Sequence, residues 1–423
     1  MTIREQKKNR IETLIRTCRV LSRMNRNRPD SMKSEQLYYQ MLDKYFSRVL
    51  AAKESGGFVT AHSVFFPVEI LYAMGVTPLH NEVSTWTMAM FLGDQNEFIT
   101  AGSELGLASE VCTAHRGLAG AYFRQAWPRV DAVLWSNLIC DNTTKCGELL
   151  MDINHCPGYF IDHPFGSSDI EEKYLVEEYR ELISFLEAKS GRKLDWDKFS
   201  QSIAEMDKQT KLQVEISELR KAIPSPLHSR RFHELLTVDY MYAGQPEATE
   251  YLTTLRDDLD AMVKKGQGAV NPERFRIMSF FIPPIYLIGF FEAVSQEFGA
   301  ANVVEPLFTY WKYSPLDPAR PLESAAKKSL MIPETRTMYG PFGQETLQDV
   351  VDCAREYKVD GAIYYAFMSC RHTCATIKIF KDLLAKLDIP MLTLDCDIMD
   401  PTINSESEVH QKMEQFFELL EDR

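Results

Sequence analysis

The chain has 423 residues and a formal net charge of −13, with 45% hydrophobic and 25% charged residues. This length exceeds one ordinary core and predicts two or three domains of a soluble globular protein. No apolar run is long enough to cross a bilayer, and the acidic charge argues against nucleic acid, whose binders concentrate positive charge. The N-terminus lacks an apolar run followed by a cleavage site, so we expect a cytoplasmic protein.

Residues 1–57 are predicted to be helical, because apolar side chains recur in them at helical spacing. From Phe58 the pattern changes to short apolar runs separated by helices, such as FVTAHSVFF and DAVLWSN, which predicts a first α/β domain with a parallel sheet over residues 58–167. Residues 168–265 combine charge with helical periodicity and predict a helical insertion. Strand signals return at FRIMSFFIPP, so residues 266–423 are predicted to form a second α/β domain that ends in a helix. The expected fold class is α/β, with two parallel-sheet domains of the Rossmann or flavodoxin-like kind beside the helical N-terminal region and the insertion.

Nine cysteines are scattered along the chain and form no CxxC pair. In a cytoplasmic chain such thiols stay reduced unless they bind metal or do redox chemistry, so we expect no disulfide framework. Cys18, Cys353 and Cys396 lie on predicted helices or at a strand end and are interpreted as packing residues. Any metal site would have to be assembled from segments that are distant in the sequence.

Three other cysteines stand where the predicted pattern turns polar. Cys140 follows the run DAVLWSNLI, Cys370 follows DGAIYYAFMS, and Cys112 stands at the head of a predicted helix. We expect all three at strand-to-helix corners, where ligands of open α/β sheets bind. Thiolates there suit soft metals and iron–sulfur clusters, and helix N-terminal amides stabilise negative charge on sulfur. A free cysteine also packs as a small hydrophobe, so position alone leaves a metal site and simple packing both open.

Three segments resemble the cysteine regions of the 2-hydroxyacyl-CoA dehydratase and benzoyl-CoA reductase family: SEVCTAHRG, LWSNLICDNTTKCGELL and MSCRHTCATIKIFKDLLAKLDIPMLTLDCDIMDP. Two further segments, FFPVEILYAMGVTPL and AIPSPLHSRRF, are similar to other elements of the family, and the resemblance extends from about residue 56 to the C-terminus. It implies two α/β domains with helical additions and a 4Fe-4S cluster held by Cys112, Cys140 and Cys370. Cys146 and Cys374 fall outside the family pattern.

The resemblance implies an oxygen-sensitive radical enzyme, either a 2-hydroxyacyl-CoA dehydratase or an aryl-CoA reductase, that passes a low-potential electron to an acyl-CoA carbonyl. It implies a heterodimer with a homologous second subunit, and a separate ATP-dependent iron–sulfur activator protein. The chain contains no P-loop of the form GxxxxGKS or GxxxxGKT. This agrees with a protein that receives the electron rather than with the activator that hydrolyses ATP. Two alternatives stay open: a double-cubane-cluster reductase of small molecules that also uses Cys146 or Cys374, and a non-catalytic partner subunit.

Glu69, among apolar residues in FFPVEILYAMG, is the candidate acid or base, since an apolar pocket raises the pKa of a carboxyl group. Its place after Pro67 fits a carboxylate in the first turn of a helix equally well. His62, His115 and Arg116 are candidates for contact with substrate or the CoA phosphates, or else polar residues that bond within the fold. The three aspartates of LDCDIMDP follow a predicted strand, where we expect them to bond to the backbone of a turn rather than to metal.

Overall fold

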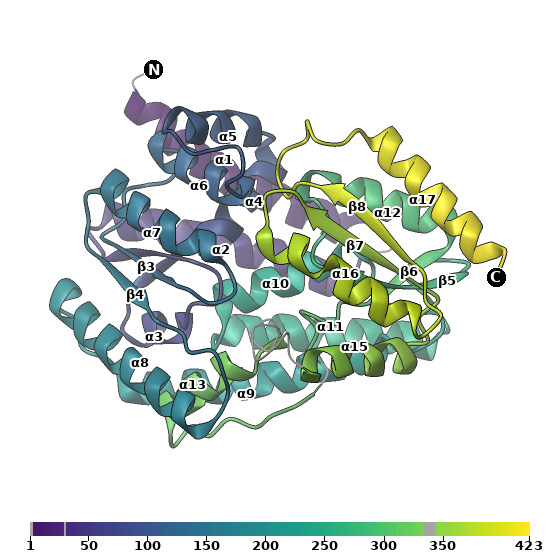
Figure 1. Cartoon of the computed structure of the whole chain (residues 1–423). Coiled ribbons are helices and arrows are strands. Elements are labelled where there is room, and N and C mark those ends of the chain that lie inside the picture. Colours follow the sequence, from purple (N-terminus) through teal and green to yellow (C-terminus); the bar gives the residue numbers. More distant parts are fainter. Residues whose placement is uncertain (1–2, 29–30, 311, 334–343) are drawn as a thin grey trace. The chain divides into compact units, whose positions relative to one another are not determined.

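The computed structural model describes residues 3–28, 31–310, 312–333 and 344–423 (Figure 1). These residues contain many helices and two four-stranded sheets in which every paired strand is parallel. The α/β fold class with parallel sheets that the sequence predicts is therefore confirmed.

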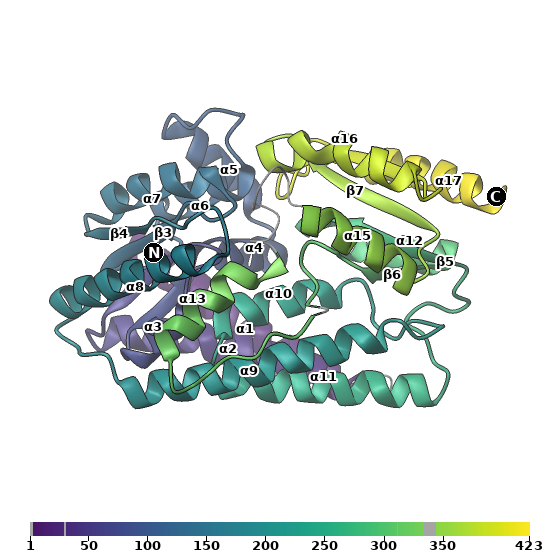
Figure 2. The same cartoon turned by 60° about the horizontal axis from the view of Figure 1, so that its bottom comes forward.

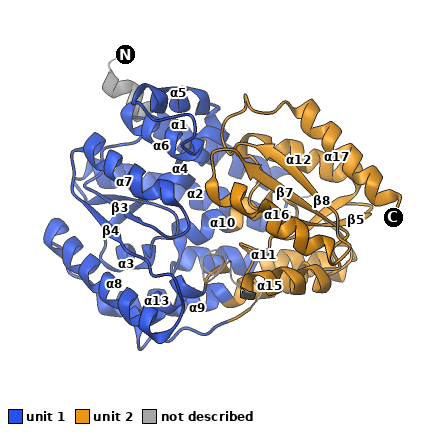
Figure 3. Cartoon of the chain, viewed as in Figure 1, with its two compact units in different colours: residues 1–210, 236–255, 314–331 blue, residues 211–235, 256–313, 332–423 orange. Residues whose placement is uncertain are grey.

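The chain forms two compact units (Figure 3). Unit 1 comprises residues 1–210, 236–255 and 314–331. Unit 2 comprises residues 211–235, 256–313 and 332–423. Each unit contains one of the two sheets, while the domain boundaries expected from the sequence stay a prediction.

The sheet of unit 1 has the strand order β2-β1-β3-β4. Its strands are β1 (Val59–His62), β2 (Thr77–His80), β3 (Ala132–Ser136) and β4 (Gly158–Ile161). β1 and β3 are buried along their whole length, as expected for inner strands of a parallel sheet that is covered on both faces. The short strand β2 was not predicted from the sequence.

Two glycines allow helices of unit 1 to pack closely on their neighbours. They are α1 (Ile3–Asn27), α2 (Lys33–Glu54), α3 (Val68–Ala73), α4 (Asn81–Leu92), α5 (Gln95–Glu104), α6 (Thr113–Phe123), α7 (Asp141–Asn154), α8 (Asp169–Ser190) and α13 (Pro321–Met331). Gly120 lets α6 lie against α5, because a Cβ there would be 1.9 Å from the Phe98 carbonyl oxygen. Gly147 lets α7 lie against β3, because a Cβ there would be 2.4 Å from the Trp135 ring.

The sheet of unit 2 has the strand order β6-β5-β7-β8. Its strands are β5 (Phe275–Phe280), β6 (Ala300–Val304), β7 (Gly361–Phe367) and β8 (Met391–Cys396). Its helices are η1 (Ile285–Leu287), α12 (Ile288–Phe298), α15 (Gln344–Glu356), α16 (Arg371–Ala385) and α17 (Glu406–Glu421). All seven residues of β7 are buried, and a capping box of Ser405 and Glu408 starts α17.

In the part of the chain that the structure describes, three helices have residues in both units: α9 (Trp196–Leu219), α10 (Arg231–Tyr242) and α11 (Pro246–Lys264). Figure 2 shows the long helices α9 and α11 as neighbours, and side-chain bonds join them. In unit 1, Gln209 Nε2 donates to Thr249 Oγ1 at 3.1 Å. In unit 2, Arg256 pairs with Glu215. None of the helices described here has the length and apolar character needed to cross a membrane.

Candidate functional site

Cys140 stands at the corner between β3 and α7, where it is the N-cap residue of the helix. Ile139, just before it, has a left-handed backbone (φ 61°), which turns the chain out of the strand direction. Thr143 Oγ1 lies 2.6 Å from the carbonyl oxygens of both Ser136 and Cys140. The threonine hydroxyl therefore links the end of the strand to the start of the helix.

The corner between β7 and α16 repeats this geometry in unit 2. Cys370 is the N-cap residue of α16 with φ −111° and ψ 107°, compared with φ −118° and ψ 109° at Cys140. Thr373 Oγ1 lies 3.1 Å from the carbonyl oxygen of Phe367 and 3.0 Å from that of Cys370. Each unit thus presents a cysteine after the third strand of its sheet, with a threonine three residues later.

Cys112 is likewise an N-cap residue, at the start of α6. The element before it is α5, so the predicted strand-to-helix corner is wrong for Cys112, which lies in a connection between two helices. The helix head was predicted correctly. The preceding segment, ITAGSELGL, is short and apolar enough to resemble a strand, whereas its first residues continue α5.

The helices α6, α7 and α16 each begin directly after one of these cysteines. The positive end of each helix dipole therefore lies beside one of the three cysteines, where it can favour negative charge on an adjacent group. At Cys140, burial raises the pKa of the thiol to about 12, although the amides of Asn142 and Thr143 act in the opposite direction. As a free side chain Cys140 is a neutral thiol near pH 7.

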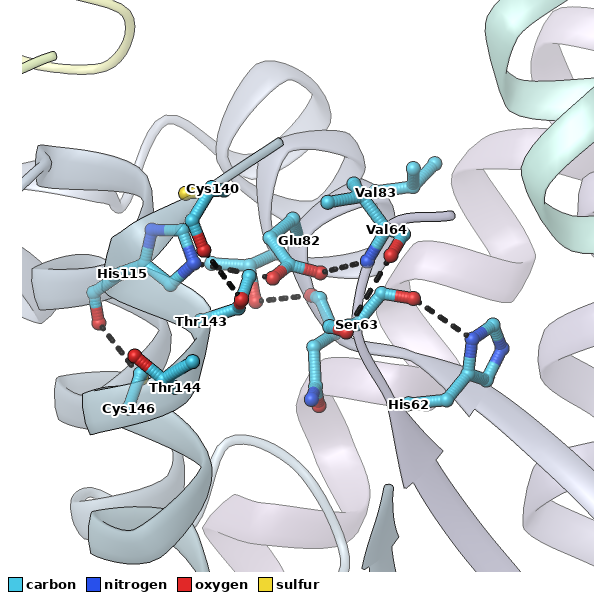
Figure 4. Close-up of polar contacts among 12 residues, drawn as sticks. His62, Ser63, Val64, Glu82, Val83, His115, Cys140, Thr143, Thr144 and Cys146 are labelled. Carbon is cyan, nitrogen blue, oxygen red and sulfur yellow. Dashed lines mark hydrogen bonds and ion pairs between the residues drawn. The ribbon is translucent and has the colours of Figure 1, made fainter. Parts of the chain in front are cut away.

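A buried carboxylate, Glu82 in the first turn of α4, lies close to these corners in unit 1 (Figure 4). Its Oε2 atom accepts a hydrogen bond from the Val64 amide at 3.1 Å, and its Oε1 atom lies 3.2 Å from His115 Nε2. Burial by itself would lower the pKa of His115, but contacts with Cys112 and Glu82 raise it to about 10. Sequence reasoning missed Glu82, because an acidic residue in the first turn of a helix is common and gives no signal of its own.

The two additional thiols near the corners contact backbone carbonyls. Cys146 Sγ lies 3.9 Å from the His115 carbonyl oxygen, and Cys374 Sγ lies 3.3 Å from that of Phe367. Burial, with a smaller effect of the Glu82 charge, raises the pKa of Cys146 well above its usual value. Both thiols are therefore placed to donate hydrogen bonds within the fold.

His62 ends β1 and Glu69 lies in the first turn of α3, and each is 1% exposed. His62 Nδ1 lies 3.2 Å from the Ser63 carbonyl oxygen, and burial lowers the pKa of His62 to about 4. Burial raises the pKa of Glu69, while Lys328 has a smaller, opposite effect. Glu69 thus occupies both predicted settings at once, a helix first turn and an apolar interior. Arg116 is a buried residue of α6.

Two of the three aspartates of LDCDIMDP form the turn that the sequence predicts, whereas Asp395 lies within β8. Asp397 Oδ1 accepts hydrogen bonds from the amides of Met399 and Asp400, each at 2.9 Å. Asp400 Oδ1 accepts one from the Thr402 amide at 2.9 Å. These carboxylates therefore organise the chain after β8.

Over the described part of the chain, no three His, Cys, Asp or Glu side chains stand together in an arrangement that could hold a metal ion. Cys112 and Cys140 belong to unit 1, and Cys370 belongs to unit 2. The convergence of the three sulfur atoms on one cofactor therefore stays a prediction.

Fold and corners together define an α/β protein of two parallel-sheet units that carries cysteines at helix N-termini. Residues 63–420 match the family described as 2-hydroxyglutaryl-CoA dehydratase, D-component, and the chain belongs to this family. The resemblance seen in the sequence is thus confirmed.

Its relatives include subunits of two kinds of enzyme. The chain is 23% identical to a benzoyl-CoA reductase subunit of Thauera aromatica, over 93% of this chain and 96% of that protein. It is also 23% identical to the (R)-2-hydroxyisocaproyl-CoA dehydratase alpha subunit of Clostridioides difficile, over 90% of this chain and 95% of that protein. A third relative, the alpha subunit of (R)-2-hydroxyglutaryl-CoA dehydratase of Acidaminococcus fermentans, is 25% identical over 71% of this chain and 62% of that protein.

Proposed function

We propose that this chain is the iron–sulfur subunit of a cytoplasmic, oxygen-sensitive enzyme that acts on CoA thioesters, of the 2-hydroxyacyl-CoA dehydratase or benzoyl-CoA reductase type. Family membership and the names of the relatives support this proposal. The observation that carries it is local geometry. The three cysteines that correspond to the family's ligand positions, Cys112, Cys140 and Cys370, are all N-cap residues of helices.

A 4Fe-4S cluster fits this donor set. Three thiolates are soft ligands, and helix N-terminal amides can donate to the sulfur atoms of a cluster and stabilise its negative charge. Cys140 would lose its proton on ligation, because metal binding offsets the cost of a partly desolvated thiolate. When bound, such a cluster supplies an electron of low potential and, with three protein ligands, one open iron.

Glu69 and His62 are the proposed proton-handling residues. Burial favours the protonated form of Glu69, and its Oε2 atom has no hydrogen-bond partner among the described residues, so it can present a proton. The contact of His62 Nδ1 with the Ser63 carbonyl assigns the ring proton to Nδ1 and leaves Nε2 as an acceptor. The two side chains therefore offer one donor and one acceptor in a dry interior.

The proposal includes three partners. A homologous second subunit completes a heterodimer, which agrees with the naming of the relatives as individual subunits of larger enzymes. A separate ATP-dependent iron–sulfur activator protein delivers the electron, and an acyl-CoA is the substrate. We propose no nucleic acid or membrane partner.

Iron and sulfide quantitation after anaerobic purification tests the proposal. We expect brown protein with about four irons and four sulfides per chain, and background iron in the Cys112→Ser variant. Cys156→Ser is the control, because Cys156 follows the end of α7 and should leave the iron content unchanged. About eight irons, with dependence on Cys146 or Cys374, would select the double-cubane reductase. Colourless wild-type protein without iron would select a partner subunit whose cysteines only pack.

A further inference from the structure

Unit 2 carries a cleft at the end of its sheet that lies opposite to the Cys370 corner. The cleft has a volume of about 650 Å³, which falls in the range of about 300–1,000 Å³ that is usual for ligand sites. Its lining lies where strands begin: Phe275 starts β5, Asp360 precedes β7, and Ile389 lies shortly before β8. Cys370 instead follows the end of β7, whose seven residues span roughly 20 Å. One small ligand therefore cannot occupy both places.

The helix α15 ends at this cleft in a turn that places a lysine in a strained position. The Lys358 amide donates to the Arg355 carbonyl oxygen at 3.2 Å. The next amide, of Val359, donates to the Ala354 carbonyl oxygen at 3.0 Å. These two bonds form a Schellman motif, whose left-handed position is usually held by glycine. Here Lys358 holds it with φ 52°, so the presence of a long cationic side chain instead of glycine points to a role for that side chain.

Two cations of the cleft have no acidic partner. Of the four basic residues in the lining, Arg274 and Arg423 form ion pairs with acidic residues. The other two, Arg355 and Lys358, are exposed, and neither forms an ion pair in the part of the chain that the structure describes. The carboxylate of Asp360 accepts a hydrogen bond from a backbone amide at 2.8 Å. A cation near a helix C-terminus offsets the helix dipole, but Arg355 in the last turn of α15 already does so, which leaves Lys358 unexplained.

The rest of the lining includes an apolar floor. Phe275, Ala354 and Leu420 line the cleft and are largely buried. A ligand with an apolar body and negatively charged groups can cover this floor and reach the two cations at the same time. Phosphate groups suit such cations well, because the arginine guanidinium donates two parallel hydrogen bonds to them and lysine supplies a compact charge.

We infer that the cleft binds an organic phosphate of the size of a nucleoside diphosphate. Arg355 and Lys358 bind its phosphate groups, and the nucleoside covers the apolar floor. This inference goes beyond the proposed function and does not depend on it, because none of the three proposed cluster ligands lines the cleft.

Isothermal titration calorimetry of the purified full-length protein with ADP tests the inference. We expect binding that weakens as the salt concentration rises. Arg355→Gln and Lys358→Gln should each bind ADP about tenfold more weakly, since each loses a charge-assisted hydrogen bond. Lys386→Gln is the matched control with unchanged affinity, because Lys386 is an exposed cation at the end of α16 that does not line the cleft.

Two further probes define the ligand. Inorganic pyrophosphate should bind about tenfold more weakly than ADP, because it cannot cover the apolar floor. Coenzyme A contains the same diphosphate, so its affinity measured beside that of ADP shows whether a free nucleotide or the nucleotide part of a CoA thioester is the ligand.

Lys358→Gly separates binding from folding. Glycine relieves the left-handed backbone, so this variant should unfold at a temperature equal to or above that of the wild type while its affinity for ADP falls about tenfold. Absence of ADP binding by the wild type would overturn the inference. So would wild-type affinity in both Arg355→Gln and Lys358→Gly, an equal loss in the Lys386→Gln control, or equal affinity for ADP and pyrophosphate.

Discussion

The Cys140 corner of unit 1 and the Cys370 corner of unit 2 share their backbone but differ in their surroundings. Both cysteines are N-cap residues with nearly equal dihedral angles, and a threonine three residues later bonds across each corner. Around Cys140 the interior is closed and charged, with Glu82 nearby and Cys146 buried. Around Cys370 the corner is more open, since Met368 is 62% exposed and Cys374 is exposed as well.

The two corners share one set of features, and the corner in unit 1 has a further feature of its own. The shared part is a cysteine at a helix N-terminus with a threonine link, a setting that suits a thiolate ligand. The part found in unit 1 alone is the buried Glu82 carboxylate with its contacts to the Val64 amide and to His115. The following variants test this division, from the largest expected effect to the smallest.

The largest effect is expected where the corners are equivalent. Cys140→Ser and Cys370→Ser should each reduce the iron content of the anaerobic protein from about four atoms per chain to background, because both thiolates are proposed ligands of one cluster. Iron quantitation on both variants checks this. An undiminished iron content in either variant would contradict the proposal that both cysteines are ligands of one cluster.

Both units should also share a sensitivity to acid. Burial lowers the pKa of His62 in unit 1 and of His233 in unit 2, each to about 4. The fold favours the neutral ring, so each histidine stabilises the protein fully above its unfolded pKa of about 6.5, and this contribution is lost as the pH falls toward 4. We expect a loss of about 3 kcal/mol per histidine in the free energy of unfolding.

Urea unfolding at several pH values between 7 and 4.5 measures this loss. His62→Gln and His233→Gln should each lose less stability on acidification than the wild type does. A variant with the wild-type dependence on pH would show that the replaced ring is not kept neutral by the fold.

The next largest effect on stability is expected where α7 packs closely against β3. Gly147→Ala would place a Cβ 2.4 Å from the Trp135 ring, so we expect a loss of about 2 kcal/mol from overpacking. Gly289→Ala in α12 is the matched control in unit 2, because nothing lies within 4 Å of its added Cβ. The control should be neutral or gain about 0.5 kcal/mol from helix propensity. Thermal unfolding compares the two, and equal effects would contradict the packing argument.

The smallest effect is expected from the threonine links. Thr143→Val and Thr373→Val keep the side-chain shape and remove one hydroxyl at each corner. Each should lower the free energy of unfolding by about 1 kcal/mol, the usual contribution of one hydrogen bond. Chemical unfolding of both variants gives the values. An effect at only one corner would show that the two threonine hydroxyls contribute differently to the free energy of unfolding, although the backbone geometry of the two corners is nearly the same.

Part of this molecule could be predicted from its sequence because the signals are local. β3 and β7 are unbroken apolar runs, and the abrupt polar residues after them mark the corners at Cys140 and Cys370. Helical periodicity likewise predicted the helix that begins after Cys112. By contrast, β2 has only four residues, Thr77–His80, and contains a proline, which argues against a strand.

The remaining features depend on tertiary contacts. The contacts of Glu82 with the Val64 amide and with His115 form only when the folded chain places α4 beside them. No spacing in the sequence encodes these contacts. The strand expected before Cys112 is instead the helix α5, since a short segment with mixed apolar and small residues can belong to a strand or to a helix. The proposed convergence of Cys112, Cys140 and Cys370 likewise depends on long-range chain geometry, which local patterns do not encode.

The measurement that tests the central claim most directly is iron-edge anomalous diffraction from crystals of the anaerobically purified protein. The proposed function predicts one compact iron peak per chain, bonded to the sulfur atoms of Cys112, Cys140 and Cys370. Absence of iron, or iron bonded to only one or two of these three sulfur atoms, would contradict it.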